Sequence, residues 1–195
     1  KIIRNTPVKK EDMDPEYYEA VKDLLEHPVV QKMDTFKHHD DTTLFHTLTV
    51  SQISFYLAKK FNCDAVSVAR GGLLHDLFLY DWRDGEHPNH PTKHAERALK
   101  NADKHFNLND IERDIIAKHM WPVTRKFFKY KESFLVSIVD KIVSTKEVWN
   151  MGINWVINKF TNSEKEEIQK ALDERKKVIQ KKEKISDENN NNLDE

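Results

Sequence analysis

Apolar residues recur along most of the chain at intervals of three and four positions, the spacing that places them on one face of an α-helix. Between residues 43 and 61, for example, His46, Val50, Ile53 and Leu57 fall on a single stripe. The pattern therefore predicts an all-α protein, folded as a compact bundle of six or seven helices.

Capping residues and prolines mark where these helices begin and end. Asp14, Asp64, Thr92 and Asn109 each precede a helical stretch and are predicted to be its N-cap. The segment 80–91, with a glycine and two prolines, is the clearest internal loop. The predicted helices span about residues 15–27, 43–61, 65–77, 93–106, 110–120, 132–149 and 163–184, with short helical pieces at 29–36 and 153–160.

Changes in composition divide the chain into three regions. Residues 1–35 are expected to hold a polar leader and then helices that pack on the core, and residues 36–162 to form the central helical domain. Residues 163–195 are predicted to form a charged, mostly solvated helix that ends in a disordered, asparagine-rich tail.

The overall composition excludes several classes of protein. With 33 acidic and 32 basic residues among 195, the chain lacks a surface that would bind nucleic acid over its whole extent, and only a local basic cleft is left as an alternative. The single cysteine, Cys63, leaves no intrachain disulfide and no cysteine-rich zinc site. No run of about 18 apolar residues is present, and the N-terminal segment lacks the apolar core of a secretory signal. We therefore expect a cytoplasmic protein with no membrane partner, and nucleic acid is not an expected partner.

Histidine and aspartate residues stand at otherwise apolar positions in five of the predicted helices. These residues are His46, His75, Asp76, His94, His119 and Asp140. Asp140 is the hardest to explain as a structural residue, because its helical neighbours are three valines and Ser144, and a buried carboxylate has to be paired. Lys141 or Arg125 could supply the opposite charge, and a metal ion is the other candidate. His46 taken alone could equally be a hydrogen-bonded core histidine.

The residue types indicate which metals such a cluster would bind. Neutral imidazole and carboxylate ligands suit divalent Fe, Mn, Co, Ni or Zn. With two carboxylates among six ligands, the bound charge is only partly neutralised, and the cluster attracts phosphate. Water bound to such a metal ionises near pH 7, so that hydroxide forms without a strong protein base.

The order His46 … His75-Asp76 … Asp140 resembles the H…HD…D signature of the HD superfamily of metal-dependent phosphohydrolases. The resemblance covers roughly residues 36–147, and the segment ARGGLLHDLFLYDW is its most specific part. It implies that the bundle is of the HD-domain type with a central metal site. It also implies that the central helical domain is a metal-dependent hydrolase domain.

Members of this superfamily with two metals have two further histidine ligands between the HD pair and the final aspartate. His94, in the segment HAERA that opens a helix, and His119, about one helical hairpin later, match these positions. His90-Pro91 looks like the first of these elements, but a histidine stands where a small residue belongs. We therefore prefer His94 as the ligand and keep His90 as a nearby residue. The resemblance thus implies two divalent metals per chain, bridged by Asp76.

Two departures from the family pattern narrow the expected activity. The branch that cleaves cyclic di-GMP has a double histidine followed by Gly-Tyr-Pro, whereas this chain reads HMWPVT. Many members follow the HD pair with a Gly-Lys element that contacts phosphate, a role that Arg83 would have to take here. Small stand-alone bacterial HD proteins, including hydrolases of symmetrical diadenosine tetraphosphate, are the most similar overall.

Aromatic and basic side chains could line a pocket for a base and its phosphates. The candidates are Trp82, Arg83, Trp121, Arg125, Lys126 and Lys141. The alternative for Trp82 and Trp121 is that they only cover the core.

The expected function is hydrolysis of a phosphomonoester or phosphoanhydride, with a nucleotide favoured, by attack of a metal-bound hydroxide. His75, Asp76, Arg83 and Lys141 are the expected catalytic residues, and a small phosphorylated molecule is the expected partner. Two alternatives use the same ligand set. One is a di-iron oxygenase of the same superfamily, and the other is a regulatory module that binds a nucleotide without turnover.

Overall fold

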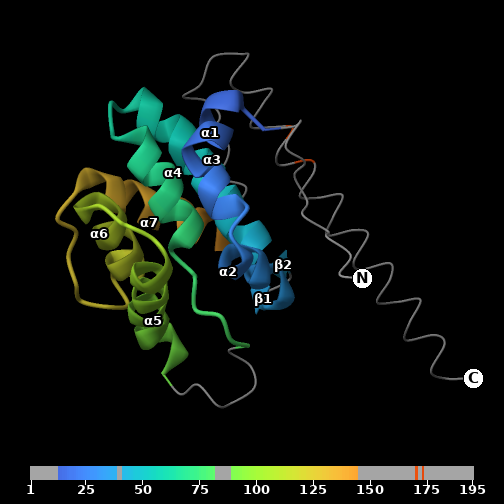
Figure 1. The fold of residues 1–195 in the computed structure, drawn as a ribbon. Coiled ribbons are helices and arrows are strands. Elements are labelled where there is room, and N and C mark those ends of the chain that lie inside the picture. The colour runs from blue at the N-terminus through green and yellow to red at the C-terminus, as the bar shows by residue number, and fades with distance from the viewer. Residues whose placement is uncertain (1–12, 39–40, 82–88, 145–169, 171–172, 174–195) are drawn as a thin grey trace, which may run out of the picture.

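The computed structural model describes residues 13–38, 41–81 and 89–144, together with residues 170 and 173. Its fold is helical, as the sequence predicts (Figure 1). The helices are α1 (Pro15–Leu25), α2 (Pro28–Gln31), α3 (Thr43–Lys60), α4 (Ala65–Leu74), α5 (His90–His105), α6 (Asp110–Lys118) and α7 (Lys131–Ser144), with a 3₁₀ turn η2 (Lys32–Thr35). The helices predicted at 153–160 and 163–184 lie almost wholly outside the described residues.

The segment that leads into α3 contains the β-structure of the described residues. Strands β1 (Lys37–His38) and β2 (Asp41–Thr42) form a two-residue antiparallel pair, with Lys37 opposite Thr42. The side chain of Thr42 then caps α3 by accepting a hydrogen bond from the backbone N–H of Phe45.

Helix α3 forms the centre of the bundle and is buried along most of its length. It packs against α4 and α7, while α4 also contacts α1 and α6. Helix α6 lies between α5 and α7 (Figure 1). Two apolar clusters result, one on each side of α3. The first includes Tyr17, Val21, Leu24, Leu48, Phe55 and Leu73, and the second includes Val50, Ile53, Ile115, Val136 and Val139.

Two helix ends differ from the prediction for local reasons. Helix α5 begins at His90 rather than after Thr92, because Asn89 adopts a left-handed conformation with φ 62° and turns the chain into the helix earlier. The Thr92 hydroxyl donates to the Asn89 carbonyl within the first turn. Helix α4 ends at Leu74 rather than near residue 77, and Nδ1 of His75 donates to the carbonyl of Gly72 at this end.

The two glycines of the ARGGLLHD segment allow helices to approach closely. A Cβ atom at Gly71 would lie 2.8 Å from Cδ1 of Ile115 on α6. At Gly72 it would lie 3.1 Å from Cα of Ser51 on α3. Ser51 cannot easily shift, because its hydroxyl accepts from Tyr17 and donates to the carbonyl of Ala69.

We expect Gly72→Ala to destabilise the protein by about 1–3 kcal/mol, because the added methyl group forces α3 and α4 apart. This cost exceeds the gain of up to about 1 kcal/mol from replacing glycine within a helix. Urea denaturation of both proteins measures the difference. Equal or greater stability of the variant would mean that the α3–α4 contact has room for a methyl group.

A buried carboxylate joins α6 to the segment that leads into α7. Asp114 forms an ion pair with Lys118 and accepts hydrogen bonds from the backbone N–H of Lys129 at 2.9 Å and from the Ser133 hydroxyl at 2.6 Å. Burial alone would raise the pKa of Asp114, but these donors outweigh burial and hold it below its usual value.

The lowered pKa of Asp114 predicts how stability depends on pH. The carboxylate stabilises the fold above its unfolded-state pKa, about 3.9, and this contribution is lost as pH falls through the folded-state pKa. Asp114→Asn should therefore cost about 1–3 kcal/mol at pH 7 and much less near pH 2. Denaturation at the two pH values tests this, and an unchanged difference would indicate a packing effect instead of a charge effect.

Candidate metal centre

Five helices bring the six predicted residues to one place in the middle of the bundle. His46 lies in the first turn of α3, the His75-Asp76 pair directly follows α4, and His94 lies near the start of α5. His119 directly follows α6, and Asp140 lies within α7. All six side chains are buried, with residue exposures of 7% or less. Their convergence is the geometry that the sequence pattern predicts.

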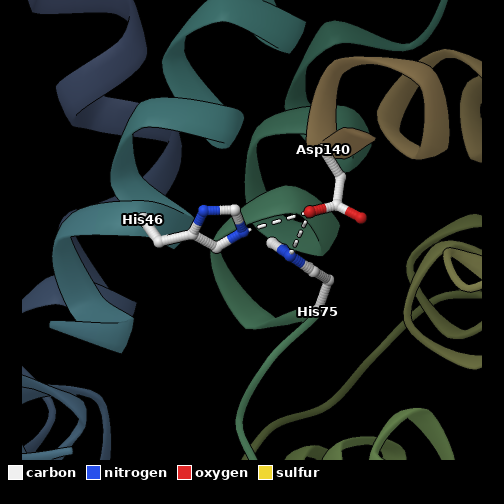
Figure 2. A group of neighbouring side chains, drawn as sticks. All are labelled: His46, His75 and Asp140. Carbon is white, nitrogen blue, oxygen red and sulfur yellow. Dashed lines mark hydrogen bonds and ion pairs between the residues drawn. The ribbon is translucent and has the colours of Figure 1, made fainter. Parts of the chain in front are cut away.

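His46, His75 and Asp140 form the first group of side chains (Figure 2). Oδ1 of Asp140 lies 3.1 Å from Nε2 of His46 and 3.6 Å from Nε2 of His75. His46 comes from α3, His75 from the end of α4 and Asp140 from α7. Their donor atoms all lie within 4.8 Å of one another.

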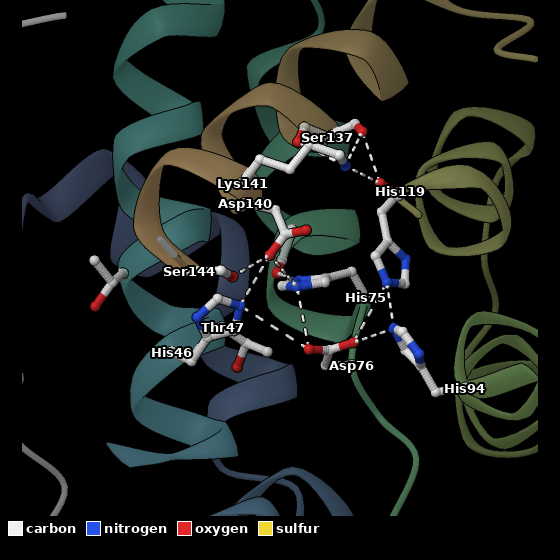
Figure 3. Close-up of polar contacts among 12 residues, drawn as sticks. His46, Thr47, His75, Asp76, His94, His119, Ser137, Asp140, Lys141 and Ser144 are labelled. Atoms are coloured by element: carbon white, nitrogen blue, oxygen red, sulfur yellow. Dashed lines mark hydrogen bonds and ion pairs between the residues drawn. The ribbon is translucent and has the colours of Figure 1, made fainter. Parts of the chain in front are cut away.

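Asp76, His94 and His119 face one another on the other side of His75 (Figure 3). Nε2 of His94 lies 2.9 Å from Nε2 of His119. Oδ1 of Asp76 lies 3.3 Å from Nε2 of His94 and 3.4 Å from Nε2 of His119. A second set of donor atoms within 4.8 Å is formed by His75, Asp76 and His119.

The two oxygens of Asp76 face different groups. Oδ1 faces His94 and His119, while Oδ2 lies 3.5 Å from Nε2 of His75 and 3.9 Å from Nε2 of His46. The carboxylate thus stands between the two groups (Figure 3). This arrangement is the one that a bridging ligand requires.

Backbone carbonyls orient two of the imidazole rings. Nδ1 of His75 lies 2.7 Å from the carbonyl of Gly72, and Nδ1 of His119 lies 2.9 Å from the carbonyl of Ile116. Because a carbonyl only accepts, each Nδ1 carries the proton. Nε2 of the neutral ring is then left with its lone pair directed into the cluster, as a metal ligand needs.

Burial shifts the pKa values of the cluster residues, and neighbouring charges oppose these shifts to different extents. Burial would lower the pKa of His75, but Asp76 and Asp140 outweigh burial and raise it to about 9. Burial lowers the pKa of His119, an effect that Asp76 opposes only in part. Burial would raise the pKa of Asp140, yet contacts with His46 and His75 hold it well below its usual value. Both carboxylate contacts of His75 thus favour positive charge at this position.

The residues present fit a transition-metal site. Among the described residues, Nε2 of His75 is buried without a hydrogen bond, although two carboxylates lie nearby. A buried polar atom of this kind requires a partner, and a cation coordinated by His75, Asp76 and Asp140 would supply one. The donors are imidazole nitrogen and carboxylate oxygen, the set that divalent Fe, Mn, Co, Ni and Zn prefer.

The other residues predicted for the site are more dispersed. Lys141 is predicted from the sequence to contact phosphate. In the structure its amine donates a hydrogen bond to the backbone carbonyl of His119 at 2.8 Å. Trp121 is half-buried and contacts the rings of Phe127 and Phe128. Arg125 and Lys126 are exposed. Trp82, Arg83 and the side chain of His90 lie outside the described residues, so their predicted roles stay predictions.

Two serines on α7 contact the cluster and are missing from the sequence-based prediction. The Ser144 hydroxyl donates to Oδ1 of Asp140 at 3.2 Å, and the Ser137 hydroxyl donates to the carbonyl of His119 at 2.6 Å. They stand three positions before and four positions after Asp140, on the same side of the helix. That spacing is the signal that could have identified them.

Comparison with known proteins identifies the family. The family model of the HD domain matches residues 43–181, and the chain therefore belongs to the HD-domain family, a superfamily of metal-dependent hydrolases. No curated protein and no solved structure matches the chain. Within the described residues, no helix is both long enough and apolar enough to cross a membrane.

Proposed function

We propose that this protein is a metal-dependent phosphohydrolase that cleaves a phosphomonoester or phosphoanhydride bond, with a nucleotide as the favoured substrate class. The observation that carries the proposal is the convergence of four histidines and two aspartates, all buried, from five helices. We assign His46, His75 and Asp140 to one metal ion and His94 and His119 to a second, with Asp76 bridging them.

The ligand set suits phosphate chemistry because it leaves positive charge uncompensated. Two carboxylates balance only half of the charge of two divalent ions, and the imidazoles of His46, His94 and His119 add no negative charge as neutral ligands. Bound metal would supply a water of lowered pKa as the nucleophile and stabilise the charge on the phosphoryl oxygens. The protein residues hold this charge in a buried site, where its attraction for phosphate is strong.

The charges around His75 link metal binding to the release of a proton. Two carboxylates lie within 3.6 Å of its Nε2, and they favour the protonated ring. Metal coordination at this atom requires loss of that proton, so metal binding releases a proton and weakens as pH falls.

A nucleotide is favoured by the segment that follows His119. It combines the half-buried Trp121 with the exposed cations Arg125 and Lys126. An aromatic ring can stack on a base, and arginine can bind phosphate oxygens in a bidentate manner. The segment leaves the cluster directly from the end of α6, so these groups are within a few residues of a ligand.

The test is hydrolysis of a panel of phosphorylated metabolites by protein stripped of metal and then reloaded with each candidate ion. We expect the stripped protein to be inactive and the reloaded protein to release inorganic phosphate or a nucleotide product. Oxygen consumption by an iron-loaded sample without phosphate release would favour the oxygenase. Thermal stabilisation by a nucleotide without turnover would favour the regulatory module. Either result would contradict the proposal.

A further inference from the structure

The backbone carbonyl of His119 accepts hydrogen bonds from two side chains of another helix. The Ser137 hydroxyl donates to it at 2.6 Å, and the amine of Lys141 donates to it at 2.8 Å. Both donors belong to α7, whereas His119 directly follows α6 (Figure 3). The last carbonyls of a helix have no partner within that helix, so they depend on donors of this kind.

The two donors also bind each other. The amine of Lys141 donates to the Ser137 hydroxyl at 2.8 Å and lies 3.2 Å from the Ser137 carbonyl. The lysine amine, the serine hydroxyl and the His119 carbonyl thus form a closed triangle of hydrogen bonds. Such a triangle fixes both the position of the His119 carbonyl along α7 and the distance of this carbonyl from α7.

The position of His119 matters for the metal centre because its ring is held through its own backbone. Nδ1 donates to the carbonyl of Ile116 in the preceding turn, so the ring moves with the end of α6. Helix α7 also carries Asp140, which belongs to the other group of ligands. One turn of α7 therefore determines the positions of Asp140 and His119 relative to each other.

We propose that Lys141 and Ser137 are positioning residues that hold His119 in place as a ligand of the second metal ion. The proposal rests on the metal centre of the proposed function, and it is independent of which substrate is cleaved. It assigns Lys141 to the support of a ligand in place of contact with phosphate. Groups that hydrogen-bond a ligand side chain typically contribute about 10- to 100-fold to metal affinity, and we expect Lys141 and Ser137 to fall in the same range.

The experiment measures metal binding by Lys141→Met, with Lys131→Met as the matched control. Lys131 also lies on α7 and donates its amine to a backbone carbonyl, that of Asn62, at 2.6 Å, far along the helix from the cluster. Each protein is stripped of metal, titrated with Zn²⁺ or Co²⁺, and analysed for the affinities of the tighter and the weaker site. Circular dichroism and melting temperature are recorded for all samples.

We expect Lys141→Met to weaken one of the two sites about 10- to 100-fold and to leave the other unchanged, while Lys131→Met changes neither. Lys141→Arg, which keeps the donors, should restore part of the lost affinity. In a His119→Ala background, Lys141→Met should have no further effect on metal binding, because the ligand it supports is gone. Ser137→Ala removes the other donor, and it gives the same test if Lys141→Met does not fold.

The outcomes separate this proposal from the proposed function. Two unchanged sites in Lys141→Met, or the same loss in Lys131→Met, would overturn the positioning role even if the protein is a hydrolase. Loss of one site in a protein that hydrolyses no phosphorylated compound would support the positioning role and contradict the proposed function. Equal weakening of both sites would mean a general effect on the fold and would also overturn the positioning role.

Discussion

Asp76→Ala is expected to remove most of the bound metal and to reduce hydrolysis to the background rate. The two oxygens of Asp76 face different halves of the cluster, so in the proposed two-metal centre the substitution removes a ligand from both sites at once. Among the described residues, Asp140 is the other carboxylate of the cluster, and its Oδ1 faces His46 and His75. It cannot take the place of Asp76 beside His94 and His119.

The measurement is metal per chain by elemental analysis, together with phosphate release and circular dichroism. Asp114→Ala is the matched control, because Asp114 is also a buried, hydrogen-bonded aspartate but lies outside the cluster. The control should lose stability and retain its metal. A full complement of metal in Asp76→Ala would exclude the bridging role.

His94→Ala and His119→Ala are each expected to lower the metal content from about two ions per chain to about one. Their Nε2 atoms lie 2.9 Å apart and both face Oδ1 of Asp76, so in the proposed centre both bind the same metal ion. Each residue lies near a helix end, and we expect the fold to survive the loss of either ring.

Asp140→Asn should affect the other half of the cluster. It keeps the volume of the side chain but removes the charge that faces His46 and His75. We expect loss of metal from this half, with the helical content unchanged.

If His94→Ala and His119→Ala both keep the full metal content of the parent, the second metal site is excluded. The protein would then bind a single metal ion through His46, His75, Asp76 and Asp140.

The convergence of the six cluster residues was predictable because each stands at an otherwise apolar position of a helix. His46 and Asp140 are polar residues within apolar stretches of helix, and such residues must find partners when they are buried. The HD pair follows a segment whose two glycines allow α4 to approach α3 and α6. These features are local, so the sequence displays them without knowledge of the packing.

Features that depend on packing between helices could not be predicted in this way. The amine of Lys141 binds a carbonyl on α6, and nothing near Lys141 in the sequence indicates that contact. The early start of α5 depends on a left-handed Asn89, a conformation that asparagine adopts in only a minority of cases.

Whether the six buried side chains hold two metal ions is tested most directly by X-ray diffraction from crystals of the metal-loaded protein, recorded at the absorption edge of the metal. We expect two anomalous peaks. One should lie among His46, His75 and Asp140, the other should lie beside His94 and His119, and Asp76 should contact both. A single peak, or metal bound elsewhere on the chain, would contradict this expectation.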